Sequence, residues 1–226
     1  MNLKTHYNNL YTESIKKISN DNYQIDELID SSLDQRFGIT LIIKPSIEVK
    51  NEIQKFLNQL KSIDPNQYYY QNSDIHITVL SIISCYNGFK LEGIKLSEYI
   101  KTIKKSIITN SNIKIEFKGI TASPSCIMIQ GFMNNKSLNE IRNNLRENFK
   151  NTTLEQSIDK RYSIQTAHST VVRFKEKLNK KSEFLETIEA FKDYTFGSFL
   201  PKNIELVYND WYQKEKHVKE LFKFEI

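Results

Sequence analysis

The chain has 226 residues, of which 39% are hydrophobic, so it can bury a core in one large domain or two small ones. It contains no apolar run of about 18 residues or more, and its N-terminus lacks the charged-then-apolar layout of a signal peptide, so we expect a cytoplasmic protein without a membrane span. The net charge of +5 is spread along the chain, which permits a phosphate-bearing ligand without marking a nucleic-acid patch. No pattern specifies an oligomer, and a monomer is favoured.

The two cysteines, Cys85 and Cys126, have no second Cys and no His at zinc-ligand spacing. This argues against a disulfide framework and a structural metal site. We interpret both as buried, small apolar residues, and we expect no metal and no cofactor.

Residues 1–35 predict a helical extension outside the main body. Their apolar positions suit one or two amphipathic helices, and they carry no recognisable chemistry. These positions are Leu10, Ile15 and Ile18, followed by Ile25, Leu28, Ile29 and Leu33.

The region from residue 36 to about residue 110 opens with a strand-helix-strand pattern. The compact apolar run 37–43 predicts a strand, and the 3.6-residue apolar period over 49–60 predicts a helix. The β-branched run 75–83 predicts a second strand, and a helix is expected from about Lys95 to Ile108.

The same pattern returns in the second half, 111–226. The run 126–132 predicts a strand, Ser137 and Glu140 predict a capping box that opens a helix, and the run 163–174 predicts another strand. Shorter elements are expected around these: strands over 113–117, 204–208 and part of 220–226, and a helix over 183–191.

The two patterns have nearly equal lengths, which indicates an internal duplication. Ile39 precedes His76 by 37 positions, and Ile129 precedes His168 by 39 positions. We therefore predict an α+β fold in which residues 36–226 form one bilobal domain with pseudo-two-fold symmetry, its lobes being about 36–110 and 111–226.

Each second strand carries a His-x-Thr-Val motif, His76-Ile77-Thr78-Val79 and His168-Ser169-Thr170-Val171. Residues i and i+2 of a strand share a face, so each motif presents an imidazole beside a hydroxyl. A neutral imidazole can take a proton from water while a protonated one gives a proton to a leaving oxygen, and two threonine hydroxyls can hold phosphate oxygens. One such motif is a weak signal and is typical of a core histidine, but two in equivalent places of a repeat favour function.

On these motifs the chain resembles the two-histidine phosphoesterase superfamily, and in particular the bacterial 2′-5′ RNA ligase-like and RNA cyclic phosphodiesterase proteins. The resemblance runs from about Phe37 to Ile226. It implies a bilobal fold whose antiparallel sheets line a central cleft containing the four motif residues. It also implies metal-independent attack on 2′,3′-cyclic phosphates or 2′-5′ linkages, with RNA ends, nucleotides or oligonucleotides as substrates.

Three further positions bear on this resemblance. Arg173 resembles an arginine that follows the second motif in some relatives and is a candidate phosphate ligand, although a regular strand would turn position i+5 away from His168. Ser169 should point away from the cleft. Ser81 stands where Arg173 does in the second motif, so the two histidines are expected to have different roles.

Other aromatic and histidine residues carry weaker signals. Tyr68, Tyr69, Tyr70, Tyr86 and Trp211 could stack a base, but such residues are more typical of packing. His6 and His217 are expected to be exposed.

Several functions remain open at this level. The site could hydrolyse RNA cyclic phosphates, degrade cyclic or 2′-5′ oligonucleotide immune signals, or cleave RNA with the ribose 2′-hydroxyl as nucleophile. A non-catalytic RNA- or nucleotide-binding module is the alternative from another class.

Overall fold

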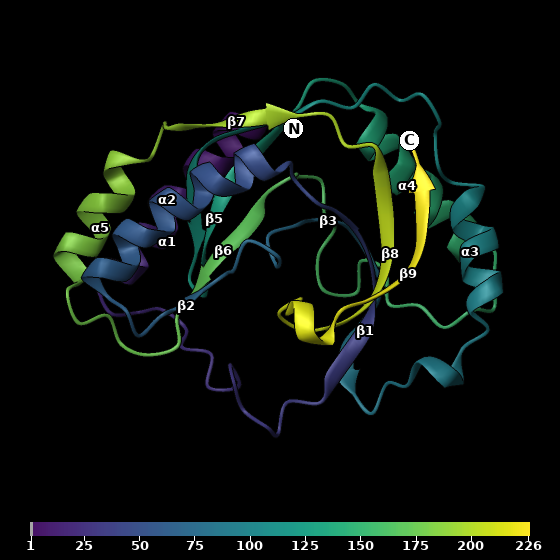
Figure 1. The fold of residues 1–226 in the computed structure, drawn as a ribbon, viewed down its shortest axis with the longest axis horizontal. Helices are drawn as coiled ribbons and strands as arrows, with labels where there is room; N and C mark the ends of the chain where they lie inside the picture. The colour runs from purple at the N-terminus through teal and green to yellow at the C-terminus, as the bar shows by residue number, and fades with distance from the viewer. Residues whose placement is uncertain (1) are drawn as a thin grey trace.

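The computed structural model describes residues 2–226 and contains two antiparallel sheets (Figure 1). The first sheet, sheet A, has the order β3 (Ile77–Asn87), β1 (Arg36–Ile43), β8 (Asn203–Asp210), β9 (Lys219–Glu225). The second sheet, sheet B, has the order β2 (Tyr68–Tyr69), β6 (Ser169–Arg173), β5 (Cys126–Met133), β4 (Ile115–Ser123), β7 (Thr195–Phe199). The predicted α+β class with antiparallel sheets is confirmed.

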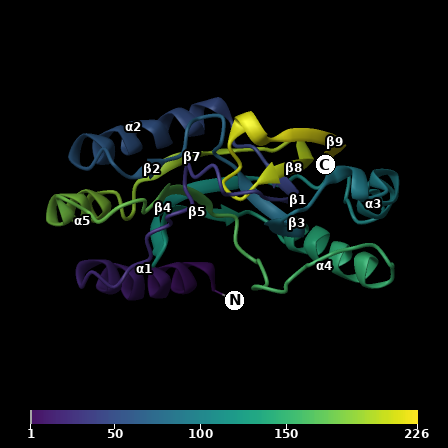
Figure 2. The ribbon, with the colours of Figure 1, turned by 90° about the horizontal axis from the view of Figure 1, so that it is seen from below.

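Within residues 2–226, five α-helices surround the sheets: α1 (Leu3–Ser19), α2 (Ile47–Ile63), α3 (Leu96–Lys104), α4 (Ser137–Lys150) and α5 (Lys181–Ala190). Helices α1, α2 and α5 gather around sheet B, and α3 and α4 lie together beside sheet A (Figure 1). Helix α1 packs on β4 and α2 on β7, and the two helices lie on opposite sides of sheet B (Figure 2). None of the helices described for residues 2–226 has both the length and the apolar character needed to cross a bilayer.

Each repeat places its helix on the sheet of the other repeat. Helix α2 connects β1 to β3 of sheet A but packs on β7 and α5, and α4 connects β5 to β6 of sheet B but packs on β3 and α3. Strand β2, from the first half, pairs with β6 of sheet B. A lobe therefore does not correspond to one of the expected halves, 36–110 or 111–226. Periodicity identified each helix but could not reveal which sheet its apolar face would cover.

The start of α4 corrects the predicted capping box. Ser137 is already the first helical residue, and its hydroxyl donates to the Ser111 carbonyl at 3.3 Å instead of capping the helix. The Ser137 backbone N–H donates to Asn135 Oδ1 at 3.0 Å. The capping-box prediction was wrong because a side chain two residues earlier binds the free N–H group at this helix end.

The N-terminal region contains one helix, α1, and no helix forms over residues 25–33, where a second one was allowed. Helix α1 is closely attached to sheet B. Its Ser14 hydroxyl donates to the Ala122 carbonyl at 2.9 Å, and Ile18 is fully buried. The expectation that these residues stand outside the main body does not hold for α1, because its apolar face completes the core of the sheet B lobe.

Candidate active site

The two motifs show the alternation that their strand positions predict. His76 immediately precedes β3 and His168 immediately precedes β6. The intervening and following residues Ile77, Val79, Ser169 and Val171 are fully buried, whereas the motif histidines and threonines are partly exposed. Each motif therefore directs one imidazole and one hydroxyl out of the core.

His76, Thr78, His168 and Thr170 line one cleft of about 880 Å³ between the two sheets. His76 and Thr78 belong to the edge of sheet A, and His168 and Thr170 belong to sheet B. Small-molecule sites have volumes of about 300–1,000 Å³, so the cleft can hold a nucleotide or the end of an oligonucleotide. Two segments that are far apart in sequence thus combine into one site.

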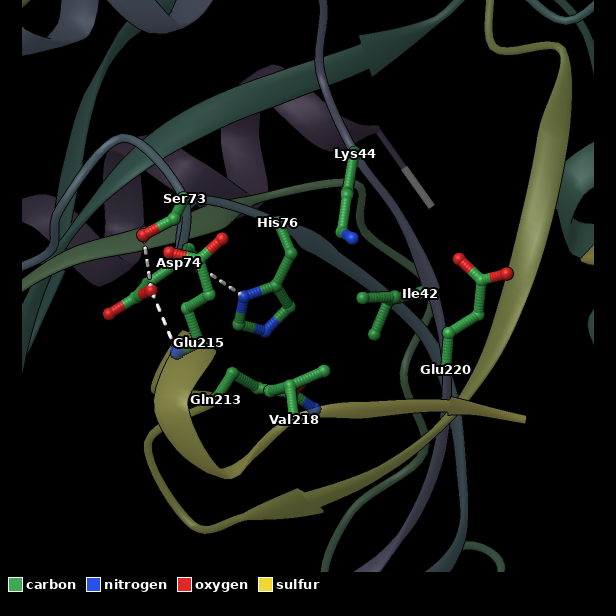
Figure 3. A pocket seen from close by; sticks show the side chains of 9 residues that line it. All are labelled: Ile42, Lys44, Ser73, Asp74, His76, Gln213, Glu215, Val218 and Glu220. Carbon is green, nitrogen blue, oxygen red and sulfur yellow. Dashed lines mark hydrogen bonds between the residues drawn. The ribbon is translucent and has the colours of Figure 1, made fainter. Parts of the chain in front are cut away.

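A backbone carbonyl sets the orientation of His76. Its Nδ1 lies 2.7 Å from the Asp74 carbonyl oxygen, which can only accept, so Nδ1 carries a proton and Nε2 is the nitrogen available to a ligand (Figure 3). The Asp74 carboxylate is itself held, because it accepts from the Ser73 hydroxyl at 2.7 Å and the Glu215 N–H at 3.0 Å. Burial lowers the pKa of His76, and the Asp74 carbonyl opposes that shift.

A hydroxyl holds His168 instead. Its Nδ1 lies 2.7 Å from Thr166 Oγ1, which can donate or accept. Burial lowers the pKa of His168 to about 4, and the positive charges of Arg142, His76 and His6 act in the same direction. The free protein therefore holds a neutral imidazole at this position at pH 7.

Arg142, on α4, connects the two motif segments from behind. Its guanidinium donates to the carbonyl oxygens of Val79 at 2.9 Å, Thr78 at 3.1 Å and Thr166 at 2.8 Å. The side chain is fully buried, and burial lowers its pKa to about 10. Sequence analysis missed Arg142, because nothing in a helical arginine indicates which distant carbonyls it will bind.

The structure corrects the argument that a regular strand would turn Arg173 away from the cleft. Ile127 pairs with Val172 but Met128 pairs with Thr170, so β6 contains one extra residue and forms a β-bulge. The bulge shifts the alternation by one, and Arg173 lines the cleft on the same side as Thr170. Its Nε donates to the Tyr70 hydroxyl at 3.1 Å.

Helix α1 forms one wall of the cleft. Thr170 pairs with Met128 and Met128 with Thr121, so all three face the same side of sheet B. The Thr121 hydroxyl donates to the Tyr7 carbonyl at 3.0 Å, which places α1 over this face. Sequence analysis found no chemistry in this helix, because its position depends on sheet contacts more than a hundred residues away.

The remaining candidates divide between the cleft and other places. His6 was expected to be exposed but is partly buried and lines the cleft, while His217 is exposed as expected. Cys126 is buried as expected, whereas Cys85 is partly exposed, and both residues line the cleft.

Five aromatic residues were considered as base-stacking candidates. Within residues 2–226, two of these five, Tyr70 and Trp211, line the cleft. The guanidinium groups of Arg36 and Arg161 lie 4.6 and 4.2 Å from the centre of the Trp211 ring.

Among residues 2–226, no group of three or more His, Cys, Asp or Glu side chains is arranged to hold a metal ion.

Comparison with known proteins identifies the fold. No protein-family model matches the chain, and no curated protein matches its sequence. Solved structures do match: a Thermus thermophilus protein with a TM-score of 0.58 at 14% identity, covering 84% of this chain and 97% of that one. Escherichia coli LigT complexed with 3′-AMP has a TM-score of 0.57 at 11% identity, covering 84% and 98%. A structure described as a phosphoesterase has a TM-score of 0.56 at 12% identity, covering 85% and 98%.

Proposed function

We propose that this chain, which has the fold expected of a two-histidine phosphoesterase, hydrolyses 2′,3′-cyclic phosphate or 2′-5′ phosphodiester bonds of RNA or nucleotides. One observation carries the proposal: His76 with Thr78 and His168 with Thr170 come from different sheets and line the same cleft. LigT, which shares the fold, was solved with the nucleotide 3′-AMP, and this supports a nucleotide-type ligand here.

His168 is the general base in this mechanism. Its low pKa keeps it neutral, so its ring can accept a proton from water. The water oxygen forms a bond to phosphorus while the bond from phosphorus to one ribose oxygen breaks.

His76 is the general acid. Burial lowers the pKa of His76, and the Asp74 carbonyl that binds the protonated Nδ1 partly opposes this shift. A bound anionic phosphate favours the imidazolium form, whose Nε2 proton is then transferred to the departing ribose oxygen. One proton leaves water and one reaches the leaving group, so the two histidines exchange protonation states once per turnover.

Thr78, Thr170 and Arg173 bind the phosphate in this proposal. Hydroxyl groups can donate to the non-bridging oxygens, and a guanidinium supplies charge-assisted hydrogen bonds to the same group. Arg173 is held for this task by its hydrogen bond to Tyr70.

The test is hydrolysis of a 2′,3′-cyclic nucleotide and of a short RNA ending in a cyclic phosphate, with EDTA present. We expect turnover by the wild type and a loss of about 10²–10⁴-fold in His76→Ala and in His168→Ala, the range of acid-base catalysis. His217→Ala removes an exposed histidine and serves as the matched control. All variants are checked for folding by circular dichroism.

The outcomes separate the alternatives. A second outcome is turnover of 2′-5′ or cyclic oligonucleotides only, again with a need for both cleft histidines. That result would indicate that the protein degrades oligonucleotide signals. A cyclic phosphate appearing as product from linear RNA would assign the nuclease reaction. If the protein binds these substrates but turns over none of them at any pH, the remaining hypothesis is a non-catalytic binding module.

A further inference from the structure

Arg161 is an arginine of the cleft wall whose guanidinium has no hydrogen-bond partner. Within residues 2–226, every other arginine bonds a carboxylate, a carbonyl or a hydroxyl, as Arg173 does with Tyr70. Arg161 makes no such bond in that part of the chain, yet it lines the same cleft as the two histidines. Its N–H groups are therefore available to a ligand.

An aromatic ring positions Arg161 in place of an acidic partner. Its guanidinium carbon lies 4.2 Å from the centre of the Trp211 ring, and Trp211 also lines the cleft. A guanidinium that lies over a ring keeps the N–H groups at its edge free to donate. Arg36 lies 4.6 Å from the same ring, but its Nε and Nη2 bond the Asp34 carboxylate at 2.8 and 2.7 Å. Of these two cations, Arg161 is the one with an unengaged edge.

The loop between α4 and β6, which carries Arg161, is attached to the fold on both sides of this residue. Before Arg161, the Ser157 N–H donates to the Ile82 carbonyl of β3 at 2.8 Å. After Arg161, the Arg146 guanidinium of α4 donates to the Ile164 carbonyl at 3.1 Å. The loop therefore presents Arg161 to the cleft from a supported backbone.

The charge of Arg161 is not neutralised within the cleft. Asp159 is the one acidic residue in the cleft lining described for residues 2–226, and its two carboxylate oxygens accept from Arg146 at 2.6 and 3.2 Å. A cleft with an unpaired cation and no unpaired carboxylate favours an anionic ligand.

The stack of Arg161 on Trp211 and the catalytic His76 lie toward opposite ends of the β1–β3 pair. His76 directly precedes β3, at the end of the pair where β1 finishes. Arg36, the second cation on the Trp211 ring, is the first residue of β1, at the end where β3 finishes. Strand β1 has 8 residues, so its ends are roughly 23 Å apart along the strand, at about 3.3 Å per residue. The two positions suit two separate phosphates of one ligand.

We propose that Arg161 binds a backbone phosphate upstream of the reacting one, so that the substrate is an oligonucleotide and not a mononucleotide. This inference rests on the proposed function and names the substrate class of the same site. In a strand that ends in a 2′,3′-cyclic phosphate, the reacting phosphorus is at the 3′ end and all other phosphates lie on its 5′ side. The free edge of the guanidinium donates charge-assisted hydrogen bonds to the non-bridging oxygens of one of them.

The experiment measures hydrolysis of a 2′,3′-cyclic phosphate at the end of a mono-, a di- and a trinucleotide. For the wild type we expect kcat/KM to rise about tenfold from the mononucleotide to the trinucleotide, and for Arg161→Gln by less than about twofold. Lys160→Gln is the matched control, because Lys160 is exposed and lies outside the cleft lining described for residues 2–226. It should keep the wild-type rise. Each protein is compared with itself across substrate lengths, so a loss of folded protein cancels from the ratio.

A trinucleotide with uncharged methylphosphonate linkages separates phosphate binding from base stacking. It should lose the rise in the wild type and react equally with Arg161→Gln. The inference is overturned if the wild type shows no rise with length, or if the rise survives either the uncharged linkages or Arg161→Gln. An equal loss of the rise in Lys160→Gln also overturns it, because that result would indicate the general charge of the loop.

Binding measurements keep this inference apart from the proposed function. Titration calorimetry with a 3′-phosphorylated mononucleotide and trinucleotide reports the Arg161 contact without turnover. A wild type that binds the trinucleotide more tightly through Arg161, but hydrolyses no phosphodiester, refutes the proposed function alone. An active wild type whose rates and affinities do not change with length refutes only the role of Arg161.

Discussion

The roles proposed for His168 and His76 depend on their neighbours and not on the motif alone. A lone histidine titrates near pH 6.5, whereas burial and three nearby positive groups lower the pKa of His168 to about 4. Both histidines stand two positions before a threonine. The Nδ1 atom of His76 binds a backbone carbonyl, whereas the Nδ1 atom of His168 binds a threonine hydroxyl. Two motifs with the same key residues therefore hold histidines with different hydrogen-bond partners.

These shifts predict an acidic optimum for kcat/KM. The proposed reaction needs neutral His168, which exists above a pKa of about 4, and protonated His76, which exists below a pKa that burial lowers from 6.5. The active protonation state is therefore most populated above about pH 4 and below the lowered pKa of His76, and kcat/KM should fall about tenfold per pH unit on the alkaline side. An anionic phosphate favours both imidazolium forms, so kcat should peak at a higher pH than kcat/KM.

The measurement is a pH-rate profile combined with NMR titration of the histidines in the free protein. His6→Ala removes one of the positive groups that act on His168, so it should raise the pKa of His168. A free-protein His168 that titrates near 6.5, with kcat/KM constant from pH 6 to 8, would contradict the assignment of base and acid.

Gly131 is the residue whose small size matters most to the second motif. A Cβ atom there would lie 1.9 Å from the Ala167 carbonyl oxygen, next to His168. We expect Gly131→Ala to push this segment away, to lower the free energy of unfolding by about 1–3 kcal/mol and to reduce kcat. Gly93→Ala is the control, because its Cβ would meet no atom within 4 Å, and it should leave both urea unfolding and kcat unchanged.

At the scale of elements, α4 holds the two motif strands together through a single side chain. Arg142→Lys keeps the charge, but one ammonium group cannot reproduce a planar guanidinium that bonds three carbonyls. The Val79 and Thr166 carbonyls that would lose their donors are buried, so we expect a loss of about 2–4 kcal/mol in unfolding free energy, together with a lower kcat.

Arg146, one turn further along α4, provides the comparison for Arg142. It binds Asp159 through two nitrogens at 2.6 and 3.2 Å and donates to the Ile164 carbonyl at 3.1 Å, but 21% of its side chain is exposed, so water can solvate the groups that a substitution leaves unpaired. Arg146→Lys should therefore lower the free energy of unfolding less than Arg142→Lys does. Equal losses in the two variants would show that Arg142 does not hold the motifs together.

Helix α1 is attached to the sheet beside His168 by the Tyr7 hydroxyl. That hydroxyl donates to the Gly131 carbonyl at 3.1 Å and accepts from the Gly131 N–H at 3.3 Å, and burial raises its pKa to about 12, so it stays protonated. Tyr7→Phe should lower the unfolding free energy by about 1–3 kcal/mol, because it leaves buried groups without partners.

The same change should increase hydrogen exchange in α1. Tyr194→Phe serves as the control, since the Tyr194 hydroxyl bonds Glu52 at the surface and should contribute little. A Tyr7→Phe variant with wild-type stability and wild-type exchange in α1 would show that packing alone attaches the helix.

At the scale of the whole molecule, the packing of α2 and α4 on the sheet of the other repeat predicts that the two lobes fold as one unit. Fragment 1–110 contains β1 and β3 but lacks β8, which pairs with β1, and lacks the β7 surface that α2 covers. We expect fragments 1–110 and 111–226 to be unfolded separately by circular dichroism and amide NMR. Co-expression should recover a folded complex, and a fragment that folds alone would contradict this account.

The sequence by itself determined the α+β class, most strands and helices, and the direction in which the motif residues point. These features follow from the periodicity of apolar residues over short stretches, because interactions between neighbouring residues are enough to determine them. Apolar spacing allowed one or two helices in residues 1–35, and among the described residues of this stretch only α1 forms, because apolar spacing alone does not make a helix. Short β7 went unpredicted because five residues carry too little pattern.

Only the tertiary structure decided which sheet each helix covers, that a bulge turns Arg173 toward the cleft, and that α1 and Arg142 stand around the histidines. Each of these depends on partners that are distant in the chain: Tyr7 bonds Gly131 across 124 positions, and Arg142 bonds Val79 across 63. Local patterns indicate burial for most core residues, although they misassigned His6 and Cys85. The particular carbonyl, strand or substrate atom that it meets is selected when the two sheets pack, because only then do desolvation and hydrogen bonding act between remote segments.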